Sequence, residues 1–168
     1  MSSPDRPGHA PPPGAAPVGL LADLAPLERA LVIALRRWCS GGATAAEFAA
    51  GLRRRLGPTE GGRAIDSLDG FLRHCLGQSR RRFVRHALDC PCFGADEAWL
   101  ADLVALSAAG DRAGAAALAR EVLHEEALDR AVDLAEDLGL ALDRTIAPSA
   151  LEALLRHRPN PPATKRTT

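Results

Sequence analysis

The sequence contains no tyrosine, a single methionine, two tryptophans and four phenylalanines among its 168 residues. It has no excess of either charge, because 21 lysines and arginines balance 21 aspartates and glutamates. This balance argues against a surface built entirely for nucleic acid or for an anionic membrane. The longest apolar run, residues 30–35, is far shorter than the roughly 20 residues that span a bilayer. We therefore expect no membrane segment.

The N-terminus also lacks a basic start followed by an apolar stretch, so it does not resemble a secretory signal, and we predict a cytoplasmic protein. A chain of this length can bury a core without disulfides or metals. Thiols stay reduced in the cytoplasm, which makes free, ligating or reactive cysteines more plausible than bridged ones. The chain has four cysteines: Cys39, Cys75, Cys90 and Cys92.

Residues 1–22 are rich in proline and glycine, and we expect a disordered leader there. Residues 23–158 should form a single helical domain, and residues 159–168 a frayed tail. Helical spacing of apolar residues, with proline and glycine as start and stop signals, predicts an all-α fold. Its seven or eight short helices would form antiparallel hairpins in one compact bundle. The expected helices are 26–39, 45–56, 60–76, 79–88, 96–109, 112–123, 126–138 and 148–156.

Two parts of this prediction stay open. One long helix over residues 112–138 fits the pattern nearly as well as two helices, and residues 140–146 could form a short extended piece. The hairpins recur about every 30 residues, and residues 106–118 faintly resemble the turn of a tetratricopeptide repeat. Only one unit shows that pattern, so it gives little support to a regular solenoid.

The sharpest chemical motif is the Cys90-Pro91-Cys92 turn with His86 four residues before it. Thiolates and imidazole are the ligands that zinc prefers, and a fourth ligand from Cys75 or Asp96 would complete a tetrahedral set. All four cysteines together would suit zinc or an iron–sulfur cluster. The sequence thus offers a metal site at His86, Cys90, Cys92 and Cys75.

A helix over residues 79–88 would argue against the four-cysteine site. It would carry the chain about 13 to 15 Å away from the end of the preceding helix, at 1.5 Å per residue. Cys90 and Cys92 would then lie far from Cys39 and Cys75. The simpler interpretation of Cys39 and Cys75 is that they are small buried residues.

No phosphate loop, nucleophile elbow or metalloprotease helix is present, so we predict no enzyme. The one exception is a thiol redox role for Cys90 and Cys92. Cys92 lies just before the expected helix that begins near Asp96 and Glu97, and it lies near Arg85. The N-terminal dipole of a helix and a nearby cation can each lower a thiol pKa.

A basic stretch is the second candidate site. Residues 53–85 carry nine basic and three acidic side chains, whereas residues 96–143 carry three basic and twelve acidic ones. Guanidinium groups of this kind bind phosphates or an acidic partner, but charge matching between the two halves of the chain, or solvated helix faces, explains the pattern better. The arginines proposed for anion or partner binding are Arg80, Arg81, Arg82 and Arg85.

The segment Leu-Arg-Arg-Trp-Cys at residues 35–39, together with His86, the Cys90-Pro91-Cys92 turn, Gly94, Asp96 and Glu97, resembles small uncharacterised all-helical proteins of alphaproteobacteria. This resemblance implies a bacterial cytoplasmic origin and brings no activity or ligand with it. Twenty of the 21 basic residues are arginine, which is typical of a GC-rich genome.

Three functional hypotheses follow. The first is a non-enzymatic helical interaction or adaptor protein with an unidentified protein partner. A second is a zinc or iron–sulfur protein centred on the Cys90-Pro91-Cys92 turn. The third is a nucleic-acid or regulatory binder that uses the basic face of residues 53–85.

Overall fold

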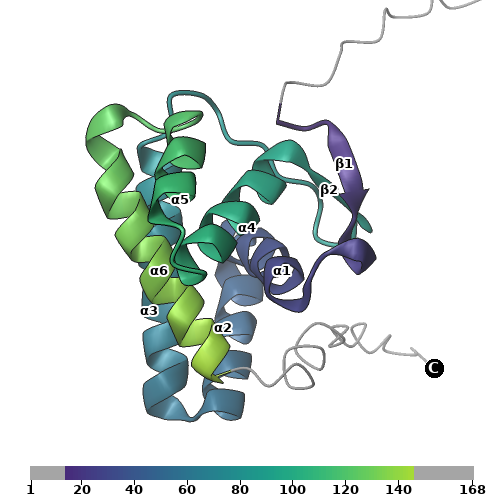
Figure 1. The fold of residues 1–168 in the computed structure, drawn as a ribbon. Helices are drawn as coiled ribbons and strands as arrows, with labels where there is room; N and C mark the ends of the chain where they lie inside the picture. Colours follow the sequence, from purple (N-terminus) through teal and green to yellow (C-terminus); the bar gives the residue numbers. More distant parts are fainter. Residues whose placement is uncertain (1–13, 146–168) are drawn as a thin grey trace, which may run out of the picture.

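The computed structural model describes residues 14–145, and over that range the chain is mostly helical. It contains six α-helices, two 3-10 turns and one small sheet (Figure 1). The elements are β1 Pro17–Leu20, η1 Leu21–Asp23, α1 Pro26–Ser40, α2 Gly42–Leu56, α3 Pro58–Gly77, β2 Cys92–Gly94, α4 Ala95–Ala108, α5 Arg112–Arg120, η2 Glu125–Ala127 and α6 Leu128–Thr145.

Local signals set most helix ends. Pro26 and Pro58 occupy first-turn positions, where a missing N–H costs nothing. Gly110 follows the end of α4 and has a φ of 80°. Only glycine adopts that conformation without strain. Asp111 then accepts a hydrogen bond from the backbone N–H of Gly114 and caps α5. These starts and stops agree with the predicted ones to within a few residues.

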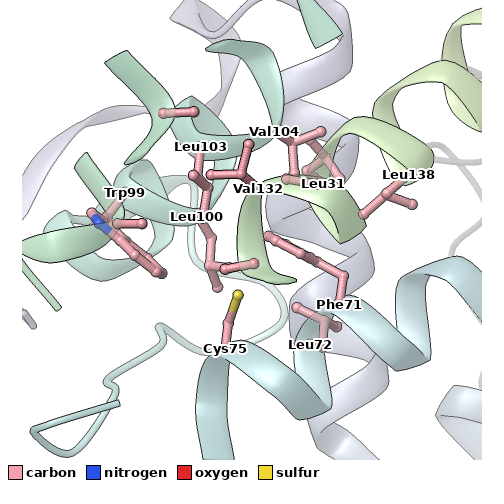
Figure 2. Packing of buried hydrophobic residues seen from close by; sticks show 14 of the residues in the cluster. Leu31, Phe71, Leu72, Cys75, Trp99, Leu100, Leu103, Val104, Val132 and Leu138 are labelled. Atoms are coloured by element: carbon pink, nitrogen blue, oxygen red, sulfur yellow. The ribbon is translucent and has the colours of Figure 1, made fainter. Parts of the chain in front are cut away.

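The main core lies between α1, α3, α4 and α6, with α5 packed against α4 and α6. Figure 2 shows its centre, where Phe71 and Leu72 of α3 meet Leu100 and Leu103 of α4 and Val132 of α6. The helix α2 packs mainly against α3 and α1. The bundle is thus organised around the apolar α4, which has buried neighbours on several sides.

The predicted number of helices and the purely all-α fold are wrong for the described residues. Strands β1 and β2 pair antiparallel and lie beside α4 (Figure 1). The strand β1 belongs to the segment expected to be a leader, and it pairs through Gly19, where a Cβ atom would come within 2.8 Å of the Phe93 ring. Strands of four and three residues are too short for an alternating pattern to be recognised. Residues 1–13 lie outside the described range.

The expected helix over residues 79–88 is also wrong, because residues 78–91 contain no helix. A helix this short is marginal without tertiary support, and here the backbone bonds to distant groups instead. The N–H of Arg80 donates to the carbonyl of Val122, and the N–H of His124 donates to the carbonyl of Gln78. The segment therefore runs beside the α5–α6 connection.

The C-terminal part differs as well. Two helices, α5 and α6, occupy residues 112–145, as preferred over one long helix. The helix expected to end at residue 138 continues through Gly139, and the extended piece expected at 140–146 is helical through Thr145. The glycine is needed for close packing, because a Cβ atom there would lie 2.6 Å from the Cβ of Ala108 on α4. The expected helix over 148–156 and the tail over 159–168 fall outside the described residues.

Candidate functional site

The loop between α3 and α4, residues 78–91, and the adjoining β2 contain His86, Cys90, Cys92 and the four arginines predicted to bind an anion or a partner. One buried arginine from α1 organises them. Arg36 has no exposed surface, and each of its five N–H donors has an acceptor. Nε and Nη2 donate to the carboxylate of Glu97 at 2.7 and 2.8 Å. The remaining three donors reach the carbonyls of Ala87, Cys90 and Cys92 at 3.0, 2.7 and 2.6 Å.

Glu97 completes this network from the first turn of α4. Its two carboxylate oxygens accept four hydrogen bonds, two from Arg36 and one each from the backbone N–H groups of His86, at 3.1 Å, and Gly94, at 3.0 Å. The side chain is fully buried. A buried ion pair is tolerated only when its remaining donors and acceptors are satisfied, and this one meets that condition.

Asp96, next to Glu97, holds the earlier part of the loop. Its carboxylate pairs with the guanidinium of Arg81 and accepts from the backbone N–H of Val84 at 2.7 Å. Its own N–H donates to the carbonyl of Gly14 at 3.3 Å. Two acidic side chains at the N-terminus of a helix are also favoured by the helix dipole. Asp96 is therefore committed to the loop and is not placed as a fourth metal ligand.

His86, Cys90 and Cys92 come together inside this scaffold. Nδ1 of His86 lies 3.0 Å from Sγ of Cys92 and 3.6 Å from Sγ of Cys90. These three form the group of potential metal donors found within the described residues, with all donor atoms within 4.8 Å of one another. All three residues are half-buried.

The other ring nitrogen of His86 determines its tautomer. Nε2 lies 3.0 Å from the carbonyl oxygen of Ala15, which can only accept, so Nε2 carries the proton. In a neutral imidazole Nδ1 then has a free lone pair, and that lone pair faces the two sulfurs. A backbone carbonyl that orients a histidine in this way is the usual companion of a metal-ligating imidazole.

The structure joins Cys90 and Cys92 as a disulfide, with their Cα atoms 5.4 Å apart. That spacing lies within the range that disulfides require. A metal ligand must be a thiolate, so the two sulfurs cannot form a disulfide and bind a metal at the same time. The site thus has two mutually exclusive chemical states.

Cys75, the fourth predicted ligand, is not in this group. It lies in the main core beside Phe71 and Leu72 (Figure 2), and burial raises the pKa of its thiol to about 12. Cys39 is a half-buried free thiol whose pKa is raised by burial, although the neighbouring Arg85 opposes that shift. The loop is not helical, so helix length is not what separates Cys75 from the site; burial in the core holds it there.

The four predicted anion-binding arginines do not form one outward row. Arg81 pairs with Asp96, Arg80 donates to the carbonyl of Arg120, and Arg85 is half-buried and donates to the carbonyl of His86 at 3.4 Å. Only Arg82 is exposed with no bonded partner among the described residues. The proposed basic face is also divided, because α3 holds 20 residues, or about 30 Å of helix, between residues 53–55 and residues 80–85.

Sequence reasoning missed the role of Arg36. A signal existed, because Arg36 follows Val32 by one helical turn and both face α4; Val32 is buried with Phe93 and Ala101. A charged residue on an apolar helix face requires a buried partner. Glu97 was recognised only for its position at a helix start, and nothing in the local pattern linked the two residues.

Comparisons with protein-family models, curated proteins and solved structures gave no match to this chain. None of the helices in residues 14–145 is both long enough and apolar enough to cross a membrane.

Proposed function

We propose that the reduced protein binds a zinc ion through Nδ1 of His86 and the Sγ atoms of Cys90 and Cys92. The observation that carries this proposal is the orientation of His86. Its protonated Nε2 is held by the Ala15 carbonyl at 3.0 Å, and its Nδ1 faces both sulfurs. Nitrogen and sulfur donors select zinc over magnesium or calcium, which prefer oxygen ligands.

Zinc fits the donor set better than an iron–sulfur cluster. Such clusters take four protein ligands, mostly thiolates, whereas two thiols and one imidazole gather in the described part of the chain. Zinc is commonly four-coordinate. The fourth position is then open to water or to a side chain of a partner protein, which would join the metal hypothesis to the interaction or adaptor hypothesis.

The buried Arg36–Glu97 pair also supports the proposal. Arg36 donates to the carbonyls of Cys90 and Cys92 at 2.7 and 2.6 Å, so the ligands are positioned before any metal arrives. Thiolate ligation requires reduced cysteines, and a cytoplasmic location would keep them reduced.

The test is zinc binding by the full chain, purified and reduced under anaerobic conditions. Metal content by mass spectrometry should give one zinc per chain, and cobalt(II) should give the absorption bands of tetrahedral thiolate coordination. We expect Cys92→Ser and Cys90→Ser each to weaken zinc binding at least 100-fold, and His86→Gln to weaken it at least tenfold.

The matched controls are Cys39→Ser and His124→Gln, which replace the same residue types outside the group. Both should retain one zinc per chain, and circular dichroism should confirm that every variant is folded. Failure of the reduced wild-type protein to retain zinc, or equal binding by Cys92→Ser and Cys39→Ser, would contradict the proposal.

A further inference from the structure

The loop that presents Cys90 and Cys92 is held by contacts that do not involve either sulfur. Nη1 of Arg36 bonds the Cys90 carbonyl and Nη2 bonds the Cys92 carbonyl. Those two carbonyls lie on either side of Pro91, so one buried guanidinium fixes the backbone on both sides of the turn. The backbone can therefore stay in place while the sulfurs change from thiols to a disulfide.

Both cysteines are also partly exposed to solvent. Cys90 and Cys92 are half-buried, and Leu88, Asp89 and Pro91, which lie just before or between them in the chain, are exposed. By contrast, Cys75 is 1% exposed. Access and proximity decide which thiols exchange with a small disulfide, and here both favour the same pair.

We propose that Cys90 and Cys92 form a reversible dithiol–disulfide pair that is oxidised by small disulfides such as glutathione disulfide, and that oxidation releases the metal. The release of metal rests on the proposed zinc site. The redox step does not, because it needs only the two neighbouring sulfurs.

The reaction balances in two steps. The thiolate of one cysteine attacks a sulfur of glutathione disulfide, which forms a mixed disulfide and expels one glutathione thiolate. The thiolate of the other cysteine then attacks the protein sulfur of that mixed disulfide and expels the second glutathione. The protein loses two electrons and two protons, both protons end on the released thiols, and glutathione disulfide is reduced to two glutathione molecules. Excess glutathione reverses both steps.

We assign the first attack to Cys92, because it lies closer to the Nδ1 lone pair of His86, which can accept the thiol proton. Its Sγ is 3.0 Å from Nδ1, whereas the Sγ of Cys90 is 3.6 Å from it. Cys90 is then the resolving cysteine. This assignment predicts different products from the two single variants. Cys90→Ser should stop at a stable mixed disulfide on Cys92, whereas Cys92→Ser should react more slowly.

The experiment treats metal-free reduced protein with glutathione disulfide and follows it by intact mass and peptide mapping. We expect the loss of two hydrogen atoms per chain, with no glutathione retained and the bridge mapped to Cys90 and Cys92. Free thiols in the denatured protein should fall from four to two. The double variant Cys39→Ser/Cys75→Ala, which leaves only the pair, should close in the same way. A wild-type protein that keeps four thiols, or that retains glutathione without closing the bridge, would overturn the proposal.

A second arm begins from zinc-loaded protein and measures released zinc with a colorimetric chelator. One zinc should be released for each disulfide formed, and excess glutathione should restore binding. The two proposals fail separately. If no zinc binds but the bridge closes, the metal site is refuted and the redox pair stands. If zinc binds but no bridge closes, the redox pair is refuted and the metal site stands. If the bridge closes while zinc stays bound, metal release is refuted.

Discussion

Replacement of Arg36 by methionine would test whether one buried side chain holds the candidate site together. Methionine fills much of the volume of the arginine stem but offers no donor. The substitution would leave the Glu97 carboxylate buried at zero exposure without its cation. It would also remove the donor from the carbonyls of Ala87, Cys90 and Cys92. The expected result is a large loss of stability together with a disordered loop.

The magnitude follows from the burial of the pair. Removal of one partner from a buried ion pair costs about 3–5 kcal/mol, because the other charge stays uncompensated. A typical domain is stable by about 5–15 kcal/mol, so the loss would be a large fraction of the total. With a urea dependence of about 2 kcal/mol per molar, the midpoint of unfolding should fall by roughly 2 M.

The assay is equilibrium unfolding in urea, monitored through the fluorescence of Trp38 and Trp99. The matched control is Arg112→Met, since Arg112 also bonds two carboxylates, Asp133 and Glu136, at 2.7 and 2.6 Å, but is half exposed. Exposed pairs are screened by solvent, and its midpoint should stay close to that of the wild type. A midpoint for Arg36→Met no lower than that of Arg112→Met would refute the reasoning.

A double-mutant cycle adds an independent check on the pair. Arg36→Met with Glu97→Leu removes both charges, so no buried ion remains without a partner. The double variant should be more stable than the sum of the two single losses predicts. Additive losses would show that the two side chains contribute separately.

Two further predictions concern the bundle itself. At Gly61 a Cβ atom would lie 2.6 Å from the Cα of Arg53 on α2, so Gly61→Ala should destabilise the protein by about 1–3 kcal/mol. Gly62 has open space around it, so Gly62→Ala should stabilise the protein by roughly 0.5–1 kcal/mol. Equal thermal midpoints of the two variants would contradict this prediction. The hydrogen bond from Arg73 holds the pKa of Asp69 below its ordinary value, so this contribution to stability is present above about pH 4 and is lost as the pH falls. Asp69→Asn should therefore lower the thermal midpoint at pH 7, and its deficit should shrink toward pH 3; a deficit that is constant with pH would show that the ion pair is not its cause.

Local patterns in the sequence determined most helix boundaries. Gly110 and Asp111 lie between the helices predicted over 96–109 and 112–123, and the stop and the cap that they provide depend on backbone geometry and bonds within four residues. The grouping of His86, Cys90 and Cys92 was predicted for the same reason, since three residues within a seven-residue segment stay close in most conformations. Their identity as metal ligands remains a prediction.

Only the tertiary structure decided how that group is held. The ion pair joins residues 61 positions apart, Arg36 and Glu97, and the tautomer of His86 depends on Ala15, which is 71 positions away. It also decided that residues 78–91 form no helix, whereas the burial of Cys75 agrees with the simpler interpretation of the sequence. The physical reason is that a charge or a polar backbone group is buried only where a partner satisfies it. Spacing along the chain does not predict which residue that partner is when it is distant in sequence.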